Sequence, residues 1–254
     1  MRIGIIGYGA IGRHLARHIL VTEGLDLSFV STRGPVADAP WSHETATGPL
    51  TDELLGTADL VIEAAHPEIV EAHGERILAQ ADLMVVSVGG LVDDARREHL
   101  VATARRHGRR IIVPHGALTG LESLAGRPST WRTATITFVK PPTAFEPAPS
   151  ETRTRSILYD GPVRGIAARY PRNVNAMVAF ALATVGLDAC RAVLVSDPGQ
   201  SFATLDYAVT GDDGGTLHVT KHQPLIGVSG SEMPDAIVHS LMTYVGGRPG
   251  LWFG

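Results

Sequence analysis

The feature that most constrains the fold is the segment "RIGIIGYGAIGRHLARHIL" near the N-terminus. A short apolar strand leads into Gly7, Gly9 and Gly12 in the G-x-G-x-x-G spacing, and an amphipathic helix follows. In such a turn the first glycine permits the tight bend, the second lets a pyrophosphate approach the backbone, and the third lets the helix pack closely on the strand. The first helical residues, Ala10 and Ile11, then offer free N–H groups to the phosphates. The segment predicts a dinucleotide-binding unit, with a purely structural glycine-rich turn as the alternative.

Strand and helix patterns alternate through the rest of the first half of the chain. The pattern predicts strands at 27–31, 58–65, 83–89 and 109–116, and helices at 67–80 and 93–108. Pro67 suits the first turn of its helix, and Asp93 and Gly108 read as the N-cap and the stop of the next one. Such alternation indicates a parallel sheet with helices on both faces.

After about Gly120 the pattern changes to that of an α+β domain. We expect strands at 133–140, 191–197, 203–211 and 216–221, with the last two joined by the hairpin turn "GDDGG", and an apolar helix at 173–186. The predicted fold class is α/β: an N-terminal Rossmann-type parallel sheet plus a smaller α+β domain with a mixed or antiparallel sheet. We place the dinucleotide-binding domain at 1–118 and the substrate and dimerisation domain at 119–230, and a final helix at 232–246 packs back on the first domain.

The end of the second strand bears on the choice of cofactor. NAD-binding domains carry an Asp or Glu there for the ribose 2′-hydroxyl, whereas this chain has Ser31, Thr32 and Arg33. Asp26 stands at the wrong end of the strand. Two hydroxyls followed by a guanidinium suit a 2′-phosphate, so we expect NADP as the preferred cofactor. The alternative is a surface arginine in a turn, with NAD as the cofactor.

Composition narrows the class of partner. The 254 residues are 44% hydrophobic and 19% charged, with a formal net charge of -4 and no basic block, which argues against nucleic acid. Cys190 is the only cysteine, so no intrachain disulfide forms, and we read it as a buried small residue. No apolar run reaches membrane-spanning length, and the N-terminus lacks a signal-peptide pattern. We expect a cytoplasmic protein that acts on a small molecule.

Several motifs together resemble one enzyme family. In order they are "GYGAIG", "DLVIEAAHPEIVEAHGERIL", "DLMVVSVGGLVD", "RRIIVPHGALTGLESL", "KPP", "YPRNVNAMVAFALATVGLD" and "VLVSDP". Their order and spacing are similar to those of L-aspartate dehydrogenases. The resemblance implies a Rossmann domain, a second domain built around a mixed sheet, and a homodimer or higher assembly. It also implies NAD(P)-dependent interconversion of L-aspartate with an imine that hydrolyses to oxaloacetate.

The chain departs from the family at its proposed acid/base. Members carry Asn-x-His on the strand after the Asp-Pro dipeptide, and the matching positions here hold Ala203 and Leu205. Leucine cannot transfer a proton, and it falls in an apolar alternation that predicts an apolar wall for the site. Aspartate as substrate is therefore in question, while the hydride-transfer scaffold is not.

His115 is a candidate for the missing acid/base. It stands in "VPHGALTG" at the end of the fifth predicted strand, where the family has a serine, and Gly116 and Ala117 follow it beside the cofactor. A histidine titrates near neutral pH and can transfer the proton. The alternative is that His115 only bonds backbone or the cofactor ribose.

Other candidates follow the ends of predicted elements. His66, after Ala65, either touches the nicotinamide ribose or caps a helix, and Lys140 is either a carboxylate anchor or a solvated lysine. Asn173 and Asn175 match the family's asparagine pair, which orients substrate or cofactor or caps the apolar helix. We list His115, Lys140, Asn173 and Asn175 as the catalytic candidates.

Two histidines on one predicted strand have a spacing that could suit a metal ion. His218 and His222 share one face of a predicted strand, but with no carboxylate or cysteine partner we expect a solvated outer face and no metal site. Lys221 and His222, just before "QPLIGVSG", are further candidates to approach the site from the second domain.

Three functions remain open from the sequence. The first is a dehydrogenase of the aspartate dehydrogenase type, acting at a CH–NH2 or imine carbon of a small amino acid. The second is a dehydrogenase or reductase for a different, even non-amine, substrate, and the third is an inactive NADP-binding protein. Relatives of dihydrodipicolinate reductase and homoserine dehydrogenase share the two-domain plan, but the histidine- and lysine-rich motif of the reductase is absent.

Overall fold

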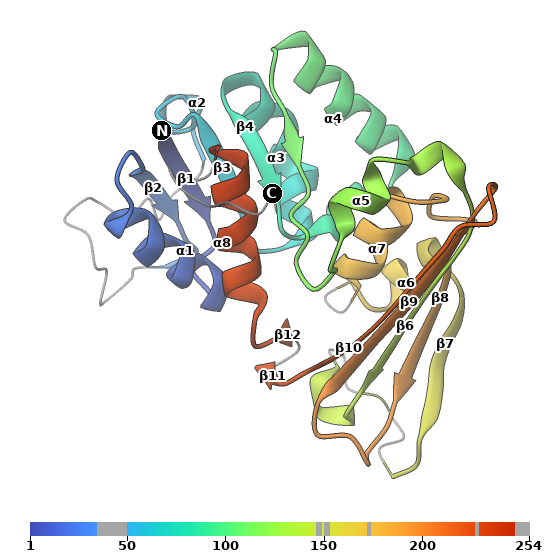
Figure 1. Ribbon diagram of the computed structural model, residues 1–254. Helices are drawn as coiled ribbons and strands as arrows, with labels where there is room; N and C mark the ends of the chain where they lie inside the picture. The colour runs from blue at the N-terminus through green and yellow to red at the C-terminus, as the bar shows by residue number, and fades with distance from the viewer. Residues whose placement is uncertain (35–49, 146–148, 150–152, 172–173, 227–228, 247–254) are drawn as a thin grey trace. The chain divides into compact units, whose positions relative to one another are not determined.

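A computed structural model describes residues 1–34, 50–145, 149, 153–171, 174–226 and 229–246. The chain forms two compact units (Figure 1). The first comprises Met1–Pro114 together with the chain from Pro234 onward, and the second comprises His115–Met233. The second unit is thus an insertion within the first.

The first unit is built on a parallel five-stranded sheet in the order β2-β1-β3-β4-β5. Its elements are β1 (Arg2–Ile6), α1 (Ala10–Val21), β2 (Asp26–Ser31), α2 (Asp52–Leu55), β3 (Leu60–Glu63), α3 (Pro67–Gln80), β4 (Asp82–Val85), the 3₁₀ turn η1 (Val88–Leu91), α4 (Asp94–Arg106), β5 (Ile111–Ile112) and α8 (Met233–Tyr244). The central strands β1, β3 and β4 are buried over nearly their whole length and are mostly apolar, as expected of a sheet covered on both faces. The predicted Rossmann-type sheet is confirmed.

Right-handed crossovers place the helices of this unit. Because β2 lies on one side of β1 and β3 to β5 lie on the other, α1 covers one face of the sheet, and α3 and α4 cover the opposite face. Helix α8 joins α1, with His14 Nε2 2.8 Å from the Asp235 carboxylate. The other end of α8 is held by Tyr244, whose hydroxyl donates to the buried Asp82 carboxylate and accepts from Arg110 at 3.0 Å.

The predicted N-cap and stop of α4 are both present. The fifth strand, β5, is shorter than expected. The Asp93 side chain accepts from the backbone N–H of Arg96 at 2.7 Å, and Gly108 follows α4 with φ +64°. The strand predicted at 109–116 pairs only at Ile111–Ile112. Pro114 has no N–H to give to the neighbouring strand, which explains why the chain leaves the sheet there.

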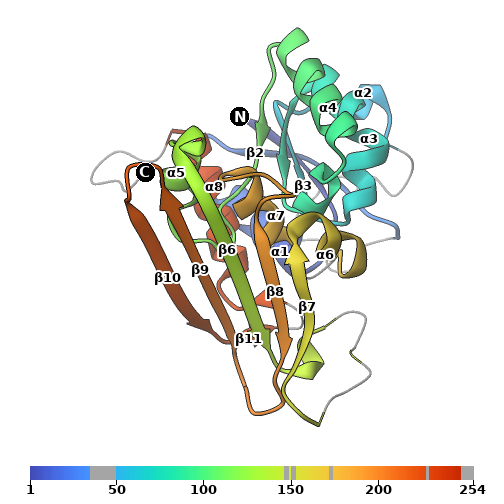
Figure 2. The same ribbon diagram turned by 90° about the vertical axis from the view of Figure 1, so that its right-hand side faces the viewer.

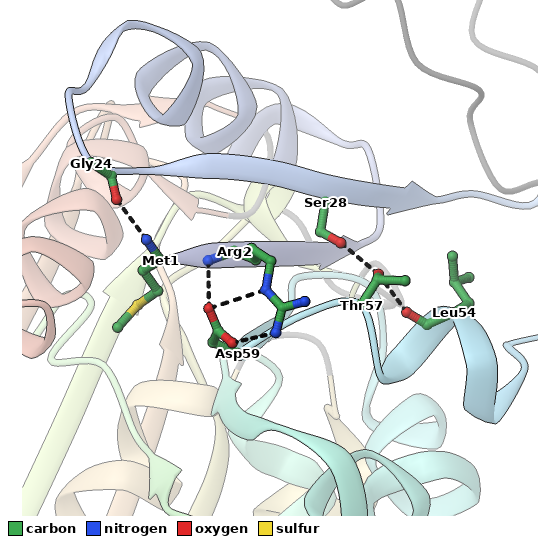
Figure 3. A network of polar contacts seen from close by, with 7 residues as sticks. All are labelled: Met1, Arg2, Gly24, Ser28, Leu54, Thr57 and Asp59. Atoms are coloured by element: carbon green, nitrogen blue, oxygen red, sulfur yellow. Dashed lines mark hydrogen bonds and ion pairs between the residues drawn. The ribbon is translucent and has the colours of Figure 1, made fainter.

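A polar network ties down the amino end of β1 (Figure 3). The N-terminal ammonium of Met1 donates to the Gly24 carbonyl at 2.6 Å. Arg2 donates to the Asp59 carboxylate from its backbone N–H at 2.8 Å and from its guanidinium at 2.7 Å. The hydrogen bond from Arg2 also lowers the pKa of Asp59. This network holds the amino end of β1 in place. In such sheets ligands bind at the opposite end, beyond the carboxyl ends of the strands.

The second unit holds a mixed sheet in the order β10-β9-β6-β8-β7, with β6 and β8 parallel and the other neighbours antiparallel. Figure 2 shows this sheet with helices on one of its faces. Its elements are α5 (Leu121–Ala125), η2 (Pro128–Thr130), β6 (Trp131–Lys140), η3 (Pro142–Ala144), β7 (Ser156–Pro162), α6 (Val163–Arg169), α7 (Asn175–Leu182), β8 (Arg191–Ser196), β9 (Ala203–Gly211), β10 (Thr216–Gln223), β11 (Leu225–Ile226) and β12 (Ser229–Gly230).

The sequence did not predict β7 or α6. Strand β7 lies at the edge of the sheet and pairs only with β8, so its side chains alternate weakly and Ile157 is 64% exposed. Helix α6 follows directly after Pro162 and buries only Val163, Ile166 and Ala167. An edge strand and a two-turn helix leave little periodic signal in a sequence.

The two faces of the second sheet differ sharply along β9. Ala203, Leu205, Tyr207 and Val209 are at most 1% exposed, and the ring of Tyr207 lies 5.2 Å from that of Phe180 in α7. The apolar alternation predicted from the sequence is therefore the core of this unit. Cys190 is also buried, as expected, and burial raises the pKa of its thiol to about 12.

The outer face of β9 and β10 carries polar side chains. His218 Nε2 lies 2.8 Å from the Asp206 carboxylate, to which Thr220 also donates at 2.6 Å. The expectation that His218 lacks a carboxylate partner is wrong, because the hairpin register brings Asp206 within reach. His222 is on the same outer face, bonded to Thr204 at 3.0 Å, and so does not join Lys221 on the inner one.

Among the described residues no three His, Cys, Asp or Glu side chains gather as a metal site would require. No helix among them is long and apolar enough to cross a membrane.

Candidate active site

The glycine turn after β1 has the geometry that a dinucleotide needs. Gly7 has φ +98°, and its N–H donates to the Ser31 carbonyl at 2.9 Å. A Cβ on Gly12 would lie 2.0 Å from the Gly7 carbonyl oxygen, so only glycine lets α1 approach this closely. A Cβ on Gly9 would meet no atom within 4 Å, which leaves open the space a pyrophosphate would take.

The N-terminus of α1 is free to bind an anion. Gly9 is its N-cap and supplies no side chain, Ala10 and Ile11 are its first two residues, and no acidic residue lies in the first turn. Arg13 places its guanidinium 5.2 Å from the centroid of the Tyr8 ring and donates to the Tyr8 carbonyl at 3.2 Å. These donors fit a diphosphate, and Arg13 is a cation that the motif alone did not reveal.

The end of β2 carries the residues expected to read the ribose. Ser31 is 8% exposed, and its carbonyl holds the glycine turn as described above. The hydroxyl of Thr32 donates to the Gly34 carbonyl, so it stabilises the bend after the strand. The side chain of Arg33 is exposed.

Glu63 holds the backbone that follows two neighbouring strands, β3 and β4. The sequence did not predict this role. The Glu63 carboxylate is fully buried and accepts from the backbone N–H groups of Ala65 and His66 at 2.8 Å each. It also accepts from the N–H of Ser87 at 3.0 Å and from its hydroxyl at 2.9 Å. Desolvation raises its pKa, and the four hydrogen bonds oppose that shift. A single acid at the end of a strand gives no sequence pattern, so nothing marked this role.

His66 has a structural role visible in the fold. It is the N-cap of α3, where its Nδ1 accepts from the Glu68 N–H at 3.4 Å, and Pro67 is the first helical residue. With Ala65, it forms the loop that Glu63 fixes after β3.

His115 begins the second unit in a tight turn. The Leu118 N–H donates to the His115 carbonyl at 2.9 Å, and Gly116 takes φ +55°. The His115 Nδ1 lies 3.1 Å from the Gly116 carbonyl oxygen, which can only accept. In this contact Nδ1 is therefore the donor.

Side chains of the second sheet hold this turn. The Tyr207 hydroxyl donates to the Thr119 carbonyl, and Lys221 Nζ donates to the Ala117 carbonyl at 3.2 Å. Lys221 also pairs with Glu232 at 2.6 Å. Tyr207 and Glu232 were missed in the sequence because only the folded sheet brings them to residues 117–119.

Lys140 is buried, contrary to its reading as a solvated lysine. It ends β6 on the inner face, is 4% exposed, and has its Nζ 4.8 Å from the centroid of the Phe138 ring. Burial lowers the pKa of its ammonium to about 8. A desolvated amine of this kind is typical of functional sites.

The asparagine candidates are only partly described. Asn175 is the first residue of α7, and Val174 stands at the N-cap, so Asn175 does not cap that helix. Asn173 lies outside the described residues. The structure thus places the glycine turn, residues 31–33 and residues 65–66 in the first unit, and His115–Ala117, Lys140 and Asn175 in the second.

The two glycines of the turn give a matched pair of variants. Gly9→Ala should fold normally but bind a nicotinamide dinucleotide at least tenfold more weakly, because its methyl group enters the open space. Gly12→Ala should lower the free energy of unfolding by about 1–3 kcal/mol, because its methyl group meets a backbone carbonyl. Calorimetry and chemical denaturation measure the two effects, and equal behaviour of the variants would contradict this assignment.

We expect the buried Lys140 ammonium to lower the free energy of unfolding at neutral pH when no ligand is bound. Its pKa is about 8 in the folded chain against 10.5 for the ordinary side chain, so the unfolded chain binds more protons between these values. The free energy of unfolding therefore rises with pH from about 8 to 10.5, and Lys140→Met should flatten that rise. At pH 7 the variant should be more stable by up to about 3 kcal/mol.

Chemical denaturation at pH 7 and 10 tests this expectation. Lys221→Met is the control, since it removes an ion-paired lysine of the same sheet face and should not gain stability at pH 7. An unchanged pH slope in Lys140→Met would refute the assignment.

Comparison with known proteins agrees with this geometry. The family model described as "Homoserine dehydrogenase, NAD binding domain" matches residues 7–114, and that described as "Aspartate dehydrogenase, C-terminal" matches residues 124–227. An aspartate dehydrogenase domain-containing protein of Xenopus tropicalis is 35% identical over 237 residues, covering 87% of this chain and 82% of the relative. L-aspartate dehydrogenase 2 of Bordetella pertussis is 34% identical over 217 residues, covering 78% of each chain.

A solved structure shares the whole fold. The crystal structure of aspartate dehydrogenase from Thermotoga maritima matches with a TM-score of 0.78 and 19% identity, over 100% of this chain and 99% of that one. The likeness confirms the predicted two-part architecture. Together with the sequence matches, it leads to one conclusion: this chain is a member of the aspartate dehydrogenase family, an oxidoreductase with an NAD-binding domain.

Proposed function

We propose that the chain is an NADP-preferring dehydrogenase that acts at the CH–NH2 carbon of a small amino acid. The observation that carries the proposal is the place of His115, whose imidazole lies in a turn fixed by Tyr207 and Lys221. The open glycine cradle supports the cofactor, and membership of the aspartate dehydrogenase family supports the reaction class.

In such a reaction the glycine turn would hold the cofactor and His115 would transfer the proton. A nicotinamide bound at the Gly7–Gly12 turn and the N-terminus of α1 supplies the hydride acceptor. Oxidation of the amine also releases a proton from its nitrogen, and His115 Nε2 takes it. The resulting imine adds water and releases ammonia, which gives the 2-oxo acid. In the reverse direction His115 returns the proton.

Leu205 favours a second candidate, a dehydrogenase of the same type with a substrate other than aspartate. Its side chain is fully buried, and Phe138 is its partner on β6. No proton donor can act from this position, so any substrate part beside it is apolar. An NADP-binding protein without turnover is what remains if neither candidate holds.

A substrate panel with a matched pair of variants tests the reaction. Reduced-cofactor formation is measured with NADP and NAD over L- and D-amino acids including aspartate, for wild type, His115→Ala and His218→Ala. We expect His115→Ala to lose at least 10²-fold in kcat, as for removal of a general base, and His218→Ala on the outer sheet face to stay near wild type. Aspartate turnover assigns aspartate as substrate, and turnover of another amino acid alone assigns the second candidate. Bound NADPH without turnover across the panel would refute both.

The cofactor preference has its own test. Arg33→Ala should reduce kcat/KM for NADP by about 10- to 100-fold, because a charge-assisted bond to the 2′-phosphate is lost, and should leave NAD nearly unchanged. Arg17→Ala, an exposed cation on α1, is the matched control. An equal effect of Arg33→Ala on both cofactors would contradict recognition of the phosphate.

We also propose that the working form is a homodimer. The outer face of the second sheet supports this, because Val139, Val193 and Ala208 are half-buried there beside threonines. Light scattering should give twice the chain mass of 26.9 kDa, and a monomer at assay concentration would rule the dimer out.

A further inference from the structure

One row of side chains crosses the inner face of the second sheet at the end of β6. In the sheet register Lys140 is the partner of Ser196 on β8, and Ser196 is in turn the partner of Ser156 on β7. The strand order β6-β8-β7 can be followed in Figure 2. The register therefore brings an ammonium and two hydroxyls into one line on one face.

The polar atoms of this row are buried. Lys140 is 4% exposed and Ser196 is fully buried. Within the described residues, the hydroxyl oxygens of Ser196 and Ser156 have no hydrogen-bond partner. Buried polar groups in native proteins are nearly always bonded, so two neighbouring hydroxyls in this state indicate a polar group that the described residues do not supply.

The hydrogen-bond donors of this row favour an anion as the ligand. A lysine ammonium and two serine hydroxyls all donate hydrogen bonds, which suits the oxygens of a carboxylate. The nearby Asp197 carboxylate has partners of its own, Arg155 at 3.3 Å and the Gly199 N–H at 2.9 Å. Burial also lowers the pKa of the Lys140 ammonium, so a bound carboxylate would favour its charged form.

Apolar side chains lie beside this row. Phe138, under the Lys140 ammonium, is the register partner of Leu205, and both side chains are buried on the same inner face. A ligand that places a carboxylate at Lys140 therefore meets apolar side chains next to it. This combination describes a small carboxylic acid with a hydrocarbon part.

We propose that Lys140, Ser196 and Ser156 form a carboxylate-binding subsite and that the substrate is a small monocarboxylic amino acid with an apolar side chain. The binding claim stands by itself, whereas the identification of the ligand as substrate rests on the proposed function. Phe138 and Leu205 contact the hydrocarbon part.

Calorimetry with two non-reacting probes, butyrate and butyramide, tests the subsite in the presence of NADP. The two probes have nearly the same shape, but only butyrate carries a charge. Wild type should bind butyrate at least tenfold more tightly than butyramide. Lys140→Met should lose that difference, Lys140→Arg should keep most of it, and Ser196→Ala and Ser156→Ala should each weaken butyrate several-fold. Arg132→Met, which removes one positive charge from an exposed position on β6, should bind butyrate as wild type does.

The outcomes separate this proposal from the proposed function. Equal binding of butyrate and butyramide, or equal loss in Lys140→Met and Arg132→Met, would overturn the subsite. Selective butyrate binding without turnover of any amino acid would support the subsite and count against the dehydrogenase. Tighter binding of succinate than butyrate would overturn the apolar side chain, because it would require a second anion site.

Discussion

The close approach of Gly12 to the Gly7 carbonyl determines how the first unit binds a ligand. With 2.0 Å between that oxygen and the place a Cβ would take, any larger residue would push α1 away from β1. The approach aims the uncapped N-terminus of α1 at the space above Gly9, where a phosphate can receive its N–H groups. The buried Glu63 complements this arrangement, because it fixes the loops after β3 and β4 from beneath.

In the second unit, by contrast, side chains of the sheet hold a turn of the backbone in place. Tyr207 and Lys221 project from adjacent strands of the inner face and hold backbone carbonyls after His115. The position aligned with the family's histidine, Leu205, is the register partner of Lys221. Two lysines, Lys221 and Lys140, lie on the same inner face as this leucine. The face therefore carries cations beside its apolar side chains.

The sequence predicted what local physics controls. The glycine turn, the cap at Asp93 and the alternation of β9 each depend on residues close together in the chain, and each appears in the structure. What it could not predict depends on tertiary packing. The burial of Lys140 follows from helices packed on the inner face, the contacts of Glu63 require two strands to meet, and the Asp206–His218 pair needs the hairpin register.

The return of α8 to the first unit has a consequence for folding. Tyr244 bonds to Asp82 across 162 residues of chain, and the whole second unit lies between them. On a ribosome the first sheet can pair early and Arg110 can reach Asp82, but the Tyr244 hydroxyl joins them only after α8 has been made. Contacts of such long sequence separation form slowly, because loop closure must precede them. The second unit therefore has time to fold before the first is complete, and nascent chains that stop short of α8 should depend on chaperones.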